Sequence, residues 1–266
     1  MKKSIETAIS ESCTIVQAKR EKERLLTIIS TLSKKEDNFV GKHFSREIYE
    51  MRFKMMYGTV LNICSQMNLQ EITYFLTLKI FDDFASKYSI STILEVECTF
   101  FCCLSLASKF AEDHTSYIDL SMIKSINPEY SKVDIVDLEK KILFATQFNF
   151  NNPTAFEIIK LLCECNSTYN CQSTKKSFNE RGRENFFSKA KEVLIMVLLD
   201  FQEIKLTNIE LGITIICFLR KLGGMVELIP SEIKNIFENE TRFIEDIALK
   251  AIENIVFNIN PNFYYE

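Results

Sequence analysis

The residues of this chain that could carry out chemistry are few, and the densest group lies in "AEDHTSY", residues 111–117. Asp113, His114 and Ser116 are the residue types of a hydrolytic triad, in which the histidine lies between nucleophile and acid. Three neighbours on one loop do not normally adopt that geometry, and such clusters are typical of turns and helix caps. The sequence also contains no phosphate-binding glycine loop and no H-E-x-x-H motif. It therefore predicts no catalytic residues, and a protein that is not an enzyme.

The 9 cysteines and 2 histidines do not form a metal-binding or disulfide pattern. No C-x-x-C pair is present, and His43 and His114 lie in unrelated places. We therefore expect no metal, no cofactor and no disulfide-linked partner. Four cysteines lie inside apolar runs, where a free thiol behaves as a small hydrophobe: Cys98, Cys102, Cys103 and Cys217.

Composition favours a large helical core. Of the 266 residues, 47% are hydrophobic, and only 6 Gly and 4 Pro interrupt the chain, which favours long helices over many short strands. The net charge of -4 gives no global basic field, so nucleic acid is not an expected partner. The N-terminus "MKKSIETAIS" lacks the apolar core of a signal peptide, and no apolar stretch approaches the ~18 residues of a membrane span. We expect an intracellular protein without membrane contact.

Hydrophobic periodicity predicts an amphipathic helix at residues 14–33, followed by two series of five helix-length segments. The third segment of each series is apolar on nearly every face, which is typical of the central helix of a bundle. The fold class is thus all-α, with two tandem five-helix units and an additional N-terminal helix. The expected domains are 1–43, 44–152 and 153–260, and the polar segment 166–183 is expected to be a solvated loop. The predicted helices are 44–65, 69–88, 92–111, 119–125 and 131–146, then 154–165, 184–204, 207–222, 231–238 and 241–258.

Lys109 ends the apolar run "CCLSLASKF" and is followed at once by acidic residues. One interpretation is that the aliphatic part of the Lys109 side chain lies along apolar surface at a helix end. Its positive charge would then be stabilised by the helix dipole. Another is that Lys109 and Glu139, which lies beside the apolar stripe of segment 131–146, bind the backbone of another protein. Periodicity does not choose between them.

Four motifs, in order, resemble the cyclin family. "MRFKMMYGTV" (51–60) is similar to the opening helix of the cyclin box, and "LQEITYFLTLKIFDDFAS" (69–86) is similar to its second helix. "LASKFAED" (106–113) resembles the signature of the third helix. "DLEKKILFATQFNFNNPTAF" (137–156) resembles the fifth helix and the start of the second fold. Arg52 and Asp82 match residues with a structural role in the cyclin box. The resemblance is strong over 44–156 and weaker beyond.

The resemblance implies a regulatory subunit that binds and activates a cyclin-dependent protein kinase in the nucleus or cytoplasm, with a role in cell-cycle control. Lys109 and Glu139 match the pair that holds the backbone at the start of the kinase's αC helix. The apolar residues that receive a side chain of that helix are matched by Leu106, Phe110, Leu143, Phe148 and Phe150.

The chain departs from the family at the dock that many cell-cycle cyclins use for Arg-x-Leu motifs of substrates and inhibitors. Met51 and Met55 are kept, whereas Lys54 and Gly58 replace an aliphatic residue and a tryptophan, so the usual dock is expected to be degraded. Asp83 stands where an arginine is usual, and Leu138 where methionine is frequent.

Alternatives to kinase activation remain open from the sequence. The cyclin fold also occurs in scaffolds and in transcription-related proteins that do not directly drive the cell cycle, and a divergent cyclin can bind a kinase without activating it. The chain contains no Arg-x-x-Leu and no Lys-Glu-Asn motif of the kind that marks mitotic cyclins for destruction.

Overall fold

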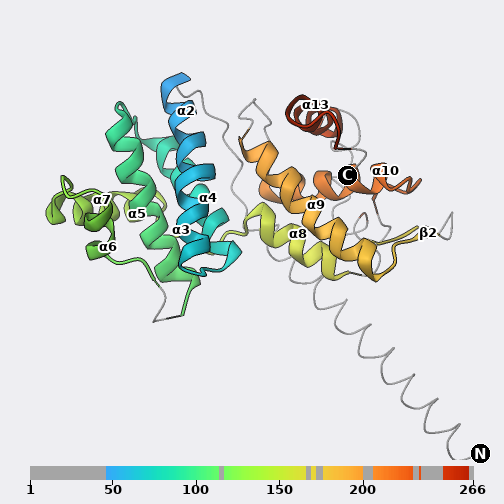
Figure 1. Ribbon diagram of the computed structural model, residues 1–266, viewed down its shortest axis with the longest axis horizontal. Coiled ribbons are helices and arrows are strands. Elements are labelled where there is room, and N and C mark those ends of the chain that lie inside the picture. The colour runs from blue at the N-terminus through green and yellow to red at the C-terminus, as the bar shows by residue number, and fades with distance from the viewer. Residues whose placement is uncertain are drawn as a thin grey trace, which may run out of the picture. The chain divides into compact units, whose positions relative to one another are not determined.

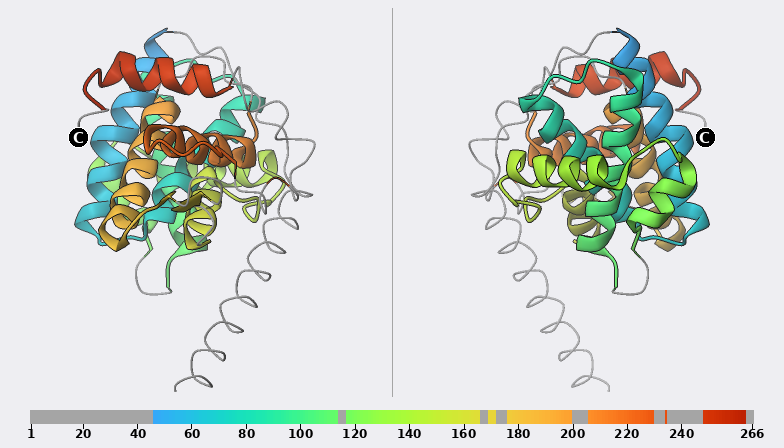
Figure 2. Two further views of the ribbon diagram at one scale, coloured as in Figure 1. Left: turned by 90° about the vertical axis from the view of Figure 1, so that its right-hand side faces the viewer. Right: turned by 90° about the vertical axis from the view of Figure 1, so that its left-hand side faces the viewer.

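The computed structural model describes residues 46–113, 117–165, 169–171, 176–199, 206–229, 234 and 248–263 (Figures 1 and 2). The chain divides into two compact units between Phe156 and Glu157, and each is described by itself below. We call them the N-terminal and the C-terminal unit. The predicted domain boundary at 152 stays a prediction, and the predicted helix at 14–33 lies outside the described residues.

The N-terminal unit is a helical bundle. Its predicted helices all appear, with ends within a few residues of the expected ones where they are described. In chain order they are α2 (Arg46–Lys54), the π-helix η1 (Met55–Val60), α3 (Leu61–Gln66), α4 (Glu71–Lys87), α5 (Ile93–Ala111), α6 (Leu120–Ile126) and α7 (Lys132–Ala145).

Helix α5 is the centre of this bundle. Thr92 and Glu95 begin it with a capping box, in which each side chain accepts a hydrogen bond from the other residue's backbone N–H. The helix packs against α2, η1, α4 and α7, and the rings of Phe81 on α4 and Phe100 on α5 stack with centroids 3.9 Å apart. Because its residues from Phe100 to Ser108 are all buried, the prediction of a central third helix is confirmed.

The first helix of the bundle, predicted at 44–65, stays helical over its described length but is not α-helical throughout. Residues Met55–Val60 form a π-helix between α2 and α3, and the Leu61 N–H donates to the Met56 carbonyl, five residues back. This wider turn buries both Met55 and Met56, which are neighbours in sequence. Gly58 lies within it at the surface. A π-turn is rare and leaves no pattern in apolar spacing, so periodicity does not reveal it.

The C-terminal unit is also helical. Its helices are α8 (Ala155–Glu164), which runs across the division between the units, α9 (Glu180–Leu199), α10 (Asn208–Leu222) and α13 (Leu249–Ile259). Helix α10 begins at the capping box of Thr207 and Glu210 and is almost wholly buried. It packs against α9 and α13, so the second predicted central helix is confirmed as well. Segment 231–238 and the first part of 241–258 lie outside the described residues, apart from Lys234.

The prediction of a loop at 166–183 is wrong in two respects. Strands β1 (Asn170–Cys171) and β2 (Lys176–Ser177) pair antiparallel within it. Helix α9 starts at Glu180, before the expected residue 184, because the Asn179 side chain accepts a hydrogen bond from the Gly182 N–H at 2.8 Å. Apart from these strands, the described secondary structure is helical, as predicted. None of the described helices is long and apolar enough to cross a membrane.

Candidate functional site

The structure pairs Lys109 with Glu139. The Lys109 Nζ lies 2.8 Å from Glu139 Oε1, and the two side chains are 36% and 13% exposed. Lys109 is in the last turn of α5 and Glu139 in the middle of α7, and these helices pack side by side. Both residues therefore lie at the surface where α5 and α7 meet.

Ser105 holds the Glu139 carboxylate in place, and the sequence analysis does not identify it. Its Oγ donates to Glu139 Oε1 at 2.7 Å and also lies 3.0 Å from the Ile118 carbonyl oxygen. A serine hydroxyl has one proton, so it serves one of these acceptors at a time. Ser105 lies one helical turn before Lys109 on α5, and that i, i+4 spacing is the signal that could have identified it. Among the described residues, the bonds to Glu139 use Oε1, which leaves Oε2 for a donor from a partner.

An apolar surface adjoins the ion pair. Leu106 and Phe150 are buried, Leu143 is half-buried, and Phe110 and Phe148 are 50% and 59% exposed. The Phe110 ring meets Phe150 edge-on with centroids 5.8 Å apart. Direct contacts thus join Lys109 to Glu139 and Phe110 to Phe150. Leu106, Leu143 and Phe148 come from the same two helices and the turn that follows α7.

Phe148 is presented by an unusual turn. Helix α7 ends in a Schellman motif, in which the Gln147 N–H donates to the Phe144 carbonyl and the Phe148 N–H to the Leu143 carbonyl. Gln147 and Phe148 have φ of 53° and 57°, a left-handed conformation that costs residues with a Cβ atom about 1–2 kcal/mol each. Strained residues of this kind concentrate at binding sites.

Phe144 extends the exposed aromatic surface and was also missed in the sequence. It is 68% exposed, and its ring meets that of Phe148 edge-on at 5.6 Å. Because Phe144 lies one residue after the apolar position Leu143, periodicity assigns it no role.

The residues of the expected Arg-x-Leu dock do not form an exposed apolar surface. Met55 is buried and Met51 half-buried, whereas Lys54 and Gly58 are exposed. A side chain at Gly58 would meet nothing within 4 Å, so the position is open to solvent. The loss of the dock's function stays a prediction.

Arg52 and Asp82 form a buried ion pair that joins α2 to α4. The Arg52 Nε and one terminal guanidinium nitrogen donate to the two Asp82 oxygens at 2.9 and 2.7 Å. Burial raises the pKa of Asp82, and the Arg52 guanidinium opposes that rise. Asp83, the neighbour that departs from the family, pairs instead with Lys79 one turn earlier at 2.8 Å. Leu138 is half-exposed on α7.

The acidic, histidine and cysteine side chains of the described residues do not gather into a metal-binding group. No group of three or more His, Cys, Asp or Glu side chains among them could hold a metal ion. Burial raises the pKa of both Cys64 and Cys163 to about 12, which keeps these thiols protonated at neutral pH. Cys98, Cys102, Cys103 and Cys217 take part in no disulfide, and all but Cys98 are buried. His114 and Ser116 lie outside the described residues.

Comparisons with known proteins agree with this architecture. Residues 25–151 match the family described as cyclin, N-terminal domain. A G2/mitotic-specific cyclin-B of Hydra viridissima is 26% identical over 136 residues, which are 50% of this chain and 34% of the relative. A G2/mitotic-specific cyclin-B of Hydra vulgaris is 25% identical over 141 residues, 52% of this chain and 38% of the relative. The matched region thus spans little more than a third of these relatives.

The fold is also similar to a solved structure. The X-ray structure of a viral cyclin from herpesvirus saimiri superposes with a TM-score of 0.61 at 13% identity, covering 91% of this chain and 100% of the viral one. That likeness extends the cyclin fold beyond the region of the family match. Residues 25–151 of this chain are thus similar to the cyclin N-terminal domain, and the chain has the cyclin fold.

Proposed function

We propose that this chain binds and activates a cyclin-dependent serine/threonine protein kinase, in cell-cycle control, through the surface where α5 and α7 meet. The observation that carries the proposal is the Lys109–Glu139 ion pair beside exposed apolar side chains. We call this surface, made by Leu106, Lys109, Phe110, Glu139, Leu143, Phe148 and Phe150, the α5–α7 surface. The similarity of residues 25–151 to the cyclin N-terminal domain supports the same function.

The composition of the α5–α7 surface suits a protein partner. Charges at the rim of an interface fix its register, while a desolvated apolar centre supplies most of the association energy. Lys109 offers N–H donors to a partner's backbone carbonyls, and Glu139 Oε2 offers an acceptor to a backbone N–H. Phe110 and Phe148, half or more exposed in the free chain, are the rings that gain most from being covered.

The chain would act by shifting the conformational equilibrium of the kinase toward its active form. A kinase whose αC helix is displaced cannot form its own Lys–Glu pair and magnesium site. A partner that binds the inward position of αC better than the outward one moves the equilibrium toward the active form. The chemistry stays on the kinase, and this chain supplies differential binding energy.

The test is copurification with candidate cyclin-dependent kinases followed by a phosphorylation assay on the complex. Truncating one partner of a desolvated, hydrogen-bonded charge pair costs about 2–5 kcal/mol of binding. We therefore expect Glu139→Ala and Lys109→Ala to lose most binding and kinase activity. Lys140→Ala is the matched control, because it removes a lysine from an exposed pair with Asp137 on α7. Equal activity of all three variants and the parent would refute the site.

The assay also separates the alternatives. Binding that depends on Glu139 without phosphorylation would identify a kinase-binding chain that does not activate. Failure of every candidate kinase to copurify, together with salt-dependent DNA binding, would favour a transcription-related scaffold.

A further inference from the structure

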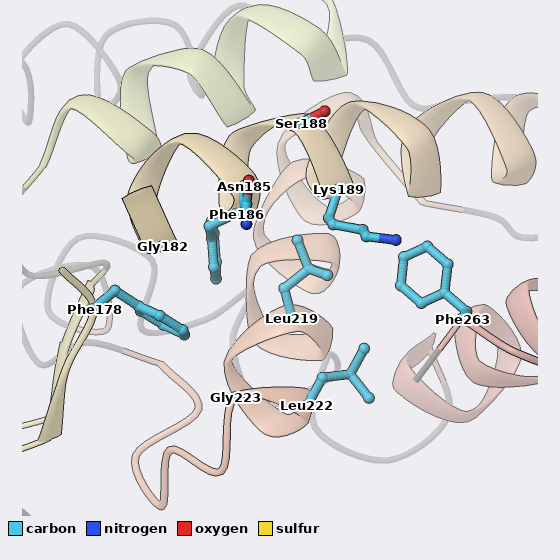
Figure 3. Close-up of a pocket in the computed structure, with 10 residues that line it drawn as sticks. All are labelled: Phe178, Gly182, Asn185, Phe186, Ser188, Lys189, Leu219, Leu222, Gly223 and Phe263. Carbon is cyan, nitrogen blue, oxygen red and sulfur yellow. The ribbon is translucent and has the colours of Figure 1, made fainter. Parts of the chain in front are cut away.

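The C-terminal unit contains a pocket that takes no part in the proposed kinase contact. It lies between α9, the end of α10 and Phe263, and its volume is about 390 Å³ (Figure 3). Ligand-binding pockets in proteins typically have volumes of ~300–1,000 Å³. The pocket is therefore large enough for an amino-acid side chain with part of the main chain that carries it.

The pocket has an aromatic end and a basic end. Figure 3 shows Phe178 and Phe186 together on one side and Lys189 with Phe263 on the other, with Leu219 between them. The Phe178 and Phe186 centroids are 5.5 Å apart. Among the described residues that line the pocket, Lys189 is the one charged side chain. The pocket is thus complementary to a ligand that is apolar at one end and anionic at the other.

Gly223 lies against the Phe178 ring at the aromatic end. A Cβ atom at this position would lie 2.5 Å from the tip of the Phe178 ring, so any side chain would displace that ring. The backbone of Gly223 has φ of -69°, which any residue adopts. The reason for glycine is therefore the close approach of Phe178.

Lys189 is positioned to receive an anion. Its Nζ lies 4.6 Å from the centroid of the Phe263 ring and 3.6 Å from Glu192 Oε2, with the lysine side chain 25% exposed. A strong ammonium–carboxylate hydrogen bond is about 2.7–2.9 Å long. The contact with Glu192 is longer than this, and an ammonium has three N–H donors, so a ligand carboxylate can approach Lys189 more closely than Glu192 does.

We propose that this pocket binds a peptide segment of a partner protein in which an aromatic side chain is followed, within three residues, by an acidic one. The aromatic side chain occupies the end formed by Phe178 and Phe186. The acidic side chain pairs with Lys189 beside Phe263. The separation of the two ends in Figure 3 requires a ligand that extends along the pocket, which a peptide chain does.

The test uses the full chain and three fluorescein-labelled peptides, Gly-Ser-Phe-Asp-Ser-Gly, Gly-Ser-Phe-Ser-Asp-Gly and Gly-Ser-Phe-Ser-Ser-Asp-Gly, each with an asparagine analogue. Fluorescence anisotropy measures binding, and no kinase is present, so the result does not depend on the proposed function. We expect at least one acidic peptide to bind saturably and at least fivefold more tightly than its asparagine analogue. In Lys189→Gln that preference disappears.

Two further variants keep the test specific. Lys191→Gln removes a lysine from the same helix that lies over the ring of Phe187 and does not line the pocket, so peptide affinity stays unchanged. Gly223→Ala displaces the Phe178 ring and weakens the acidic peptide and its analogue alike, while circular dichroism reports whether the fold is kept. The proposal is overturned if no peptide binds saturably, or if Lys189→Gln and Lys191→Gln behave alike. Competition by 3-phenylpropionate at equal concentration would also overturn it, because the occupant would then be a small aromatic acid.

Discussion

Glu112, directly after α5, caps the start of α4: its Oε1 accepts a hydrogen bond from the Gln70 N–H at 2.7 Å. Gln70 is the N-cap residue of α4, and its own side chain makes no capping hydrogen bond. The hydroxyl of Thr73 donates to the same Glu112 oxygen. A residue some forty positions away in the chain therefore accepts from the N-cap N–H, which the N3 residue of a capping box serves when it is glutamate or glutamine.

Replacing Glu112 with alanine is expected to lower the free energy of unfolding by about 1 kcal/mol, which is the usual loss for a helix cap. Urea unfolding followed by circular dichroism measures this. Asp113→Ala is the control, because that neighbouring acid is exposed, and it should change stability by no more than about 0.5 kcal/mol. Equal effects of the two variants would show that Glu112 does not act as a cap.

Loss of Arg52 is expected to be far more costly. Arg52→Ala leaves the Asp82 carboxylate buried without its bidentate partner, which typically costs about 3–5 kcal/mol. The control is Lys79→Ala, which breaks the more exposed pair with Asp83 on one helix, worth about 0.3–0.5 kcal/mol. The measurement is the urea midpoint of each variant, and a loss below about 1 kcal/mol for Arg52→Ala would contradict the structural role assigned to the pair.

Gln147→Gly is expected to stabilise the chain. Gln147 has φ of 53° at the position of a Schellman motif where glycine is usual. Glycine adopts this conformation without steric cost, although its greater freedom in the unfolded chain offsets part of the gain. We expect a net increase of about 0.5–1 kcal/mol in the free energy of unfolding. Asn149→Gly, two residues on, where φ is not positive, should destabilise, and the same sign for both variants would argue against relieved strain.

Stability is expected to fall as pH rises above about 8. Burial raises the pKa of Cys64 to about 12, whereas a thiol in the unfolded chain titrates near ~8.5. In that window the unfolded state releases a proton that the folded state keeps, so the free energy of unfolding decreases with pH. Urea unfolding in reductant at pH 7.5 and 9.5 tests this. Cys64→Ala should have a shallower pH dependence than the parent, and an unchanged slope would rule out a contribution from this thiol.

Much of the fold could be predicted from the sequence because strong local signals agree with packing. The apolar runs that form α5 and α10 are apolar on nearly every face, which is typical of the central helix of a bundle. Thr92 with Glu95, and Thr207 with Glu210, begin these helices within a residue of the expected start. Periodicity gives a joint role of Lys109 and Glu139 as one of two interpretations, and the resemblance favours it. Their contact depends on how α5 packs against α7.

The features that escaped prediction depend on contacts distant in sequence or on backbone geometry. The π-turn at Met55–Val60 leaves no pattern in apolar spacing, and the left-handed position after α7 is occupied by Gln147 and not by the glycine that would mark it. Ser105 acts through Glu139 on another helix. Phe144 matters only because Phe148 turns back to meet it.

The aromatic pair Phe144 and Phe148 also bears on the handling of the isolated protein. These two rings, 68% and 59% exposed, form an apolar patch on the surface. In concentrated solution the patches of two molecules offer each other the cover that a partner would provide, so colloidal behaviour should improve when this patch is occupied. We therefore expect the chain to be easier to store and to crystallise with a partner bound than alone.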